Sequence, residues 1–390
     1  MTQSQTHGSH PTSQADFPLV VPDHRFDQRN EMFKRRTWDE DVWRKVEPFY
    51  SQVYHDERYG FRKLDYALRN AAWSIESAFA QGTQSGNRGL YSWDYVTEKV
   101  RHHAKTGDPV TYSPETNARI VKKAARFFGA DLVGICHAHP NLIYSHELDL
   151  ITGQHHPIEL PDGCKHAIVM AVEMDYGAMH YSPDAISGAA TGLGYSQQAT
   201  VAHFVAAFIR GLGYRAIPCG NDTALSIPLA IAAGLGELGR MGLLITEKYG
   251  PRVRLCKVFT DLPLSHDTFR PFGVAEFCQV CRRCAMHCSA QAISFGEPTM
   301  TGPSPANHSG VSKWYIDPEK CYAFWGQNLM DCTRCVAVCP FNKPAGRVYD
   351  VARFFMRRFP RLNPLWLHLD ELAGFGRRSA GRKEDFWESP

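Results

Sequence analysis

The placement of cysteine constrains this chain more than any other feature of its sequence. Eight of the twelve cysteines lie between residues 278 and 339, in two blocks of four. The blocks are Cys278, Cys281, Cys284 and Cys288, followed by Cys321, Cys332, Cys335 and Cys339. Thiolates at such short spacings are typical ligands of a metal centre. The fold must therefore bring these sulfurs together.

The spacing is that of a bacterial two-cluster ferredoxin, in which three cysteines of a block bind one [4Fe-4S] cluster and the fourth binds the other. This rule assigns Cys278, Cys281, Cys284 and Cys339 to one cluster, and Cys288, Cys321, Cys332 and Cys335 to the other. Two departures leave every ligand in place: Ser289 replaces the usual proline, and the long gap before Cys332 predicts a loop. Zinc sites and disulfides are alternative interpretations of paired cysteines, but neither needs eight cysteines in this order.

Composition is that of an ordinary soluble globular protein with two or three domains. The chain has 390 residues, of which 44% are hydrophobic and 21% charged. Its net charge of +3 is too small to favour a nucleic-acid partner. No apolar run reaches the length of a transmembrane helix.

The N-terminal residues 2–16 are polar and are expected to be disordered. Arg35 and Arg36 could suggest a twin-arginine export signal, but the acidic run 39–41 follows where an apolar region is required. The sequence therefore predicts a cytoplasmic location, which also keeps cluster-binding thiols reduced.

Apolar periodicity gives an approximate map of the elements. It predicts helices at 61–79, 114–128 and 196–212, and strands at 131–136, 167–173 and 214–218. The glycine-rich stretch 226–242 either lets backbone approach a flat ligand or serves as turns, and no dinucleotide-binding fingerprint is present. The aromatic- and arginine-rich C-terminus is expected to form a helical clamp over the core and cluster domain, with a membrane-surface or partner-docking face as the alternative.

Several isolated residues are interpreted as structural. Histidines at strand ends and in loops have no partner at a recognised metal-ligand spacing, and lone cysteines are expected to be small buried residues. These are His137, His139, His155 and His156, and Cys136, Cys164, Cys219 and Cys256.

Several motifs in the same order resemble the corrinoid-dependent reductive dehalogenases. The motifs are the runs 218–239 and 250–264, the two cysteine blocks and the closing segment 370–376. The resemblance covers the chain from Thr111 onward. It implies an α+β fold in which a nitroreductase-like corrinoid-binding core is joined to a ferredoxin-like domain with two [4Fe-4S] clusters. The expected divisions are an N-terminal region (1–110), the core (111–270), the cluster domain (271–345) and a C-terminal helical clamp (346–390).

The resemblance also implies the cofactors: two clusters that deliver electrons to a base-off, cobalamin-type corrinoid whose cobalt has no protein ligand. The sequence agrees on one point, because no aspartate stands two residues before a histidine, as the histidine-ligated corrinoid motif requires. The matching motif positions imply corrinoid contacts at Ser226, Pro228, Leu238 and Gly239.

Within the resemblance, Tyr195 stands at the position of the family's proton donor, and Asn221 and Arg254 match its companions. An isolated phenol has a pKa of about 10, and a neighbouring guanidinium favours the phenolate, so Arg254 would help Tyr195 to release its proton. The implied reaction replaces a carbon-bound halogen by hydrogen, with Tyr195 supplying the proton.

The implied partners are a small organohalide and an external low-potential electron donor, such as a ferredoxin, flavodoxin or reductase. A separate donor is expected because the fused flavin and plant-type iron-sulfur module of some members is absent. Two alternatives remain. An epoxyqueuosine reductase, which modifies tRNA, shares the cofactor layout but has a catalytic aspartate and helical repeats after the clusters. A non-enzymatic corrinoid or electron carrier would not need the long stretch before Cys278.

Overall fold

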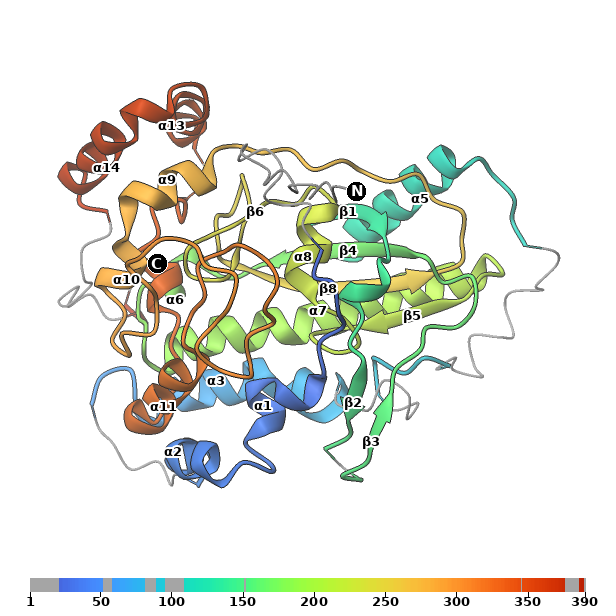
Figure 1. Cartoon of the computed structure of the whole chain (residues 1–390), viewed down its shortest axis with the longest axis horizontal. Helices are drawn as coiled ribbons and strands as arrows, with labels where there is room; N and C mark the ends of the chain where they lie inside the picture. Colours follow the sequence, from blue (N-terminus) through green and yellow to red (C-terminus); the bar gives the residue numbers. More distant parts are fainter. Residues whose placement is uncertain are drawn as a thin grey trace, which may run out of the picture.

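The computed structural model describes residues 21–51, 58–80, 89–94, 109–150, 152–344, 346–375 and 386–388. Four antiparallel strands form its central sheet, in the order β1–β4–β8–β5 (Figure 1). They are β1 (Leu132–His137), β4 (His166–Glu173), β5 (Ala216–Cys219) and β8 (Val253–Thr260). The strands predicted at 131–136, 167–173 and 214–218 are thus confirmed within two residues.

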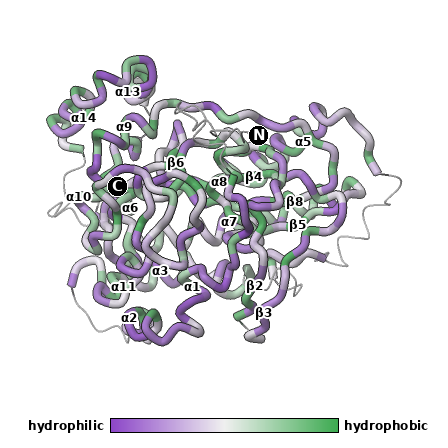
Figure 2. The backbone as a smooth tube through the Cα atoms, viewed as in Figure 1, coloured by the Kyte–Doolittle hydropathy of each residue, from purple (hydrophilic) through white to green (hydrophobic). Residues whose placement is uncertain are grey.

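Helices cover both faces of this sheet, which explains why β4 reads as an unbroken apolar run. Its residues Ile168, Met170 and Val172 pack in the core on the side of helix α7, whereas Ala167, Val169 and Ala171 pack in the core on the side of helix α8. Figure 2 shows the hydrophobic positions gathered along these central elements. The covering helices are α5 (Pro114–Phe127), α7 (Ala185–Gly211) and α8 (Ser226–Ala232), and α3 (Lys63–Ile75) packs against α7.

Helix α7 begins eleven residues earlier than the predicted start at Ser196. The carboxylate of Asp184 caps it by accepting hydrogen bonds from the backbone amides of Ile186 (3.0 Å) and Ser187 (3.2 Å). Tyr195, which precedes the predicted helix, therefore lies in mid-helix. Glycine disfavours helix by about 1 kcal/mol, but tertiary packing overrides this propensity here.

Two other helical predictions hold. Helix α5 begins at Pro114, and the Ser113 hydroxyl accepts a hydrogen bond from the Thr116 amide at 3.3 Å. The helix predicted at 61–79 is α3 followed by a short π-helix, η3 (Glu76–Ala80).

The glycine-rich stretch 226–242 is more regular than expected. It contains helix α8 and the strand β6 (Glu237–Leu238), which pairs with β7 (Leu244–Ile245). A Cβ added at Gly236 would lie 2.2 Å from the Ile245 carbonyl oxygen, and one at Gly239 would lie 2.6 Å from its Cδ1. These two glycines therefore let the backbone pack closely within the β6–β7 hairpin. This packing role explains both glycines without a ligand.

The cysteine-rich segment forms short helices beside the sheet (Figure 1). A hydrophobic cluster of Met241, Ile245, Phe277, Trp314 and Phe341 surrounds several of the cysteines. The helices are α9 (Val274–Cys281), α10 (Arg283–Met286), α11 (Pro318–Asn328) and α12 (Arg334–Ala337), and α6 (Tyr176–Met179) contacts α12. The N-terminal elements are η2 (Gln28–Asn30), α1 (Met32–Arg35) and α2 (Glu40–Ser51), and α2 packs against α11.

The C-terminal helices lie beside α9, as Figure 1 shows at the upper left. They are α13 (Arg347–Arg358), η5 (Pro360–Leu362) and α14 (Asn363–Leu372). The buried guanidinium of Arg283 forms ion pairs with Asp370 and Glu371, and Lys343 reaches Asp370 at 2.6 Å. These contacts attach α14 to the cluster segment, whereas the proposed domain boundaries and a clamp over the core stay predictions.

The remaining described elements form the edge of the molecule that faces α1. They are η4 (Pro140–Leu142) and the paired strands β2 (His146–Leu148) and β3 (His155–Pro157). None of the described helices has the length and apolar character needed to cross a membrane. The predicted disorder at 2–16 and the end of the 370–376 motif fall outside the described residues.

Candidate active site

The structure brings together the three residues expected to act in catalysis. The side-chain amide of Asn221 donates a hydrogen bond to the Tyr195 hydroxyl at 2.9 Å. The Arg254 guanidinium donates to the same oxygen at 3.4 Å, and its carbon lies 4.6 Å from the centre of the Tyr195 ring. The residues come from α7, the turn after β5 and strand β8. One phenol oxygen thus accepts two hydrogen bonds from segments far apart in the sequence.

Trp73, on α3, also contacts the Tyr195 ring. The two rings are stacked, with centroids 5.1 Å apart and an interplanar angle of 25°. The indole nitrogen also donates to the Gly188 carbonyl at 3.1 Å. Helix 61–79 was expected only to pack, so sequence analysis missed Trp73. The one sequence signal for this contact is Gly192, which leaves room for a large side chain one helical turn before Tyr195.

Glycines in α7 make this arrangement possible. A Cβ at Gly192 would lie 2.3 Å from the Trp73 ring, and one at Gly194 would lie 2.9 Å from Cγ of Arg254. Real Cβ atoms do not approach other atoms so closely. The two glycines therefore let Trp73 and Arg254 reach Tyr195.

We expect Gly192→Ala to destabilise the protein by about 1–3 kcal/mol, because the new methyl group must displace Trp73. Gly211, at the end of the same helix, has no atom within 4 Å of an added Cβ, so Gly211→Ala is a matched control. It should be neutral or stabilising by up to about 1 kcal/mol. Anaerobic denaturant unfolding of both variants measures the difference, and equal effects would refute the packing role of Gly192.

A buried lysine supports the turn that carries Asn221. Lys257 is fully buried on β8, and its ammonium donates to the Gly220 carbonyl at 2.5 Å and to the Ser226 hydroxyl at 3.0 Å. Burial lowers the pKa of Lys257, whereas the nearby Asp222 carboxylate opposes that shift. Ser226, at the start of α8, therefore lies beside the turn that holds Asn221 against Tyr195.

A buried carboxyl lies close to this region. Burial raises the pKa of Glu76 to about 8, and the negative charge of Asp222 adds to the rise. The Glu76 amide donates to the Ser196 hydroxyl at 3.2 Å, next to Tyr195 in the chain. Glu76 is therefore largely protonated at neutral pH and adds little negative charge near the phenol.

The first set of cysteines gathers around one point. Burial raises the pKa of Cys278 to about 12, and Cys281 adds to the rise. Burial also raises the pKa of Cys284, to which Cys278, Cys339 and Cys281 contribute further. Such mutual repulsion requires sulfurs that lie close together. Buried thiolates need nearby positive charge, which the iron of a cluster supplies.

The second set behaves in the same way. Burial raises the pKa of Cys321 to about 12, with contributions from Cys332 and Cys288. Burial raises the pKa of Cys335 as well, and Cys332, Cys321, Cys284 and Cys288 add to it. Because Cys284 belongs to the first set, the two sets adjoin each other. None of the twelve cysteines forms a disulfide. Neighbouring cysteines thus influence one another within and between the two sets, while the assignment of each set to one cluster stays a prediction.

The residues expected to contact the corrinoid lie on helix α8 and on or next to strand β6, two elements that contact each other. Ser226 and Pro228, on α8, and Leu238, on β6, are half-buried, whereas Gly239 is buried. The next residue, Arg240, is 1% exposed, and its Nε donates to the Cys278 carbonyl at 3.0 Å. Sequence analysis missed Arg240, since an arginine after a glycine-rich stretch reads as a surface residue.

An open groove of about 710 Å³ lies on another face of α7. It is lined by Leu193, Ser196, Gln197, Thr200 and Val201 of that helix, together with residues of β4 and of the turn that follows α5. These positions are three or four residues apart, so they form one helical stripe, and Tyr195 lies on the opposite side. The groove is therefore not the space in front of the phenol.

Comparison with known proteins agrees with this geometry. A 4Fe-4S dicluster domain model matches residues 277–343, the segment that holds both cysteine blocks. A tetrachloroethene reductive dehalogenase from Desulfitobacterium hafniense is 36% identical over an alignment that covers 86% of this chain and 74% of that protein. This chain belongs to the reductive dehalogenase family. The predicted family is therefore confirmed.

A solved reductive dehalogenase, described as suggesting a mechanism for B12-dependent dehalogenation, has the same fold. It matches this dehalogenase with a TM-score of 0.73 and 27% identity, over 92% of this chain and 48% of the solved chain. This chain thus spans about half the length of that protein. The predicted α+β fold with its two-cluster domain is confirmed.

The epoxyqueuosine reductases match a much smaller part of this chain. An epoxyqueuosine reductase from Listeria monocytogenes is 31% identical over only 31% of this chain. The similarity to the dehalogenases extends across most of the sequence instead. The comparisons therefore favour the dehalogenase prediction over the tRNA-modifying alternative.

Proposed function

We propose that this chain replaces a carbon-bound halogen of a small organohalide by hydrogen, with Tyr195 as the proton donor. The observation that carries the proposal is the convergence of Asn221 and Arg254 on the Tyr195 hydroxyl. Both groups donate hydrogen bonds, so the phenol oxygen accepts twice and its own hydrogen remains available to a substrate. The same two donors stabilise the phenolate that is left after proton transfer.

A corrinoid suits the character of the residues predicted to contact it. Half-buried Ser226, Pro228 and Leu238 offer a partly apolar surface, and the buried Nε of Arg254 has no hydrogen-bond acceptor among the described residues. A corrinoid carries an apolar ring and amide side chains, which match such a surface and such a donor. When bound, it supplies the redox chemistry at the carbon–halogen bond. The missing Asp-x-His motif supports a base-off form without a histidine ligand to cobalt.

The protein's share of the reaction is positioning and proton transfer. Stacking on Trp73 fixes the plane of the Tyr195 ring, while Asn221 and Arg254 fix its oxygen. Lys257 in turn holds the carbonyl of the residue before Asn221. A donor fixed on several sides is preorganised for transfer to a developing carbanion.

Electrons would enter through the two [4Fe-4S] clusters assigned to the eight cysteines. An external low-potential donor, of the ferredoxin, flavodoxin or reductase class, would supply them. A cytoplasmic location stays part of the proposal, because cluster assembly needs reduced thiols.

Halide release from anaerobically reconstituted protein tests the function. The protein would be supplied with corrinoid, iron and sulfide, and assayed with tetrachloroethene and a panel of aryl and alkyl halides under a strong artificial reductant. We expect corrinoid-dependent halide release from at least one class. Protein that holds both the corrinoid and the clusters but releases halide from none of these substrates would refute the proposal. Binding to tRNA would then be tested.

A further inference from the structure

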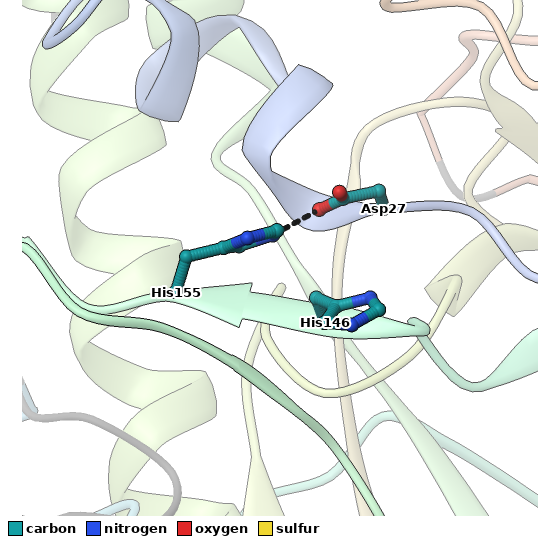
Figure 3. Close-up of side chains that lie close together, drawn as sticks. All are labelled: Asp27, His146 and His155. Atoms are coloured by element: carbon teal, nitrogen blue, oxygen red, sulfur yellow. Dashed lines mark hydrogen bonds and ion pairs between the residues drawn. The ribbon is translucent and has the colours of Figure 1, made fainter.

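We propose that Asp27, His146 and His155 form a divalent-cation site that takes Zn²⁺. One ligand atom from each residue lies within 4.8 Å of the other two (Figure 3). His155 Nε2 is 3.0 Å from Asp27 Oδ1, and the two imidazoles are stacked with centroids 4.8 Å apart. In a tetrahedral zinc site with bonds near 2.1 Å, neighbouring ligand atoms lie roughly 3.4 Å apart. Small side-chain movements would therefore suffice to bind the cation.

The hairpin places both histidines on one face. In the antiparallel pair β2–β3, His146 is opposite Pro157 and Leu148 is opposite His155. The histidines are thus diagonal neighbours, whose side chains point to the same side of the pair. His156 points to the other side, where its Nε2 lies 3.4 Å from the buried Glu147 carboxylate.

Other hydrogen bonds orient the ligands before any cation binds. Nδ1 of His146 contacts the Ser145 hydroxyl at 3.1 Å, which leaves Nε2 for a metal, as second-shell contacts commonly do. Asp27 Oδ1 accepts a hydrogen bond from the Arg29 amide at 2.9 Å, so the carboxylate is fixed as the cap of η2.

The backbone around the site is also held in place. The Arg25 guanidinium donates to the Tyr144 carbonyl at 2.6 Å and to Glu159 at 2.9 Å, and the Lys34 ammonium donates to the Leu148 carbonyl at 2.7 Å. These bonds attach the N-terminal segment to the hairpin on both sides of the three ligands. Preorganisation reduces the conformational entropy lost on binding.

The ligand set indicates the kind of cation. Two imidazole nitrogens and one carboxylate oxygen suit Zn²⁺, whereas Ca²⁺ and Mg²⁺ prefer oxygen ligands. His155 is exposed, so water can complete the coordination. Zn²⁺ would tie the N-terminal segment to the hairpin. The Tyr144 hydroxyl, two residues before β2, donates to the Asn221 carbonyl at 3.3 Å. A bound Zn²⁺ would therefore also stabilise the turn that carries Asn221.

Calorimetric titration with Zn²⁺ tests the site in protein whose clusters are fully assembled, so that the cysteines do not compete. We expect one tightly bound Zn²⁺ per chain. The double variant His146→Ala/His155→Ala should weaken binding on the order of 100-fold or more, because it removes two of three ligands. Asp27→Asn keeps a capping side chain and should weaken binding less.

His156→Gln is the matched control, since it changes the same hairpin on its other face and should keep wild-type Zn²⁺ affinity. Zn²⁺ should also raise the thermal unfolding midpoint of the wild type and of this control, but not of the double variant. Equal Zn²⁺ binding by the wild type and the double variant, or no binding by either, would overturn the proposal. Cluster absorbance, unchanged across the variants, reports that each one is folded.

Discussion

Tyr195→Phe is expected to lower the rate of halide release at least about 100-fold, the usual contribution of a general acid. The variant keeps the ring that stacks on Trp73 and removes only the hydroxyl to which Asn221 and Arg254 donate. Packing should therefore survive while the transferable proton is lost. Steady-state halide release, measured at equal corrinoid and iron content, gives the ratio.

Tyr144→Phe is the control for this experiment. It removes another hydroxyl that contacts Asn221, but this hydroxyl donates to the Asn221 backbone carbonyl. The rate of halide release should therefore fall less than about tenfold. A Tyr195→Phe enzyme that retains a tenth or more of the wild-type rate would exclude the phenol as the essential donor. Another proton source, such as bulk water, would then have to be considered.

Arg240→Met is expected to lower the midpoint potential of the cluster that we assign to Cys278, Cys281, Cys284 and Cys339. The guanidinium is 1% exposed and lies 4.5 Å from the Trp314 ring centre. The guanidinium donates to three backbone carbonyls, those of Cys278 (3.0 Å), Ser294 (2.8 Å) and Gly296 (2.9 Å). No carboxylate among the described residues forms an ion pair with Arg240, and the Glu297 carboxylate, the last of the groups that influence its pKa, offsets only part of its positive charge at the cysteine site.

A buried positive charge favours the reduced, more negative cluster. Loss of this charge should make reduction of the cluster less favourable by on the order of 1–2 kcal/mol. This corresponds to a fall in the midpoint potential of roughly 40–90 mV for one electron. Anaerobic redox titration followed by electron paramagnetic resonance measures the potential independently of turnover.

Arg240→Lys separates charge from packing. It keeps the positive charge but loses the fork of donors, so we expect a potential near that of the wild type with some loss of stability. The second cluster is an internal reference and should shift less. If the Lys and Met variants lowered the potential equally, the effect would come from disturbed packing and not from charge.

Comparison of sequence and structure separates two kinds of prediction. Local patterns were reliable: Ser113 and Pro114 correctly marked the start of α5, and the apolar run of β4 correctly marked a buried strand. The predicted start of α7 was wrong, because the glycines before Ser196, which disfavour helix, are tolerated inside a helix packed on several sides. His155 read as an ordinary loop residue, since its neighbours Asp27 and His146 come together only through the fold.

The sequence by itself determined the family, and it predicted which cysteines share a cluster and that Tyr195, Asn221 and Arg254 act together. Those conclusions rest on short spacings and motifs, which the order of residues contains directly. Only the tertiary structure decided that Trp73 stacks on Tyr195, that Gly192 makes room for it, and that Arg240 is buried beside the cysteines. Such contacts join segments far apart in the chain, and they depend on side-chain packing in three dimensions, which no local pattern encodes.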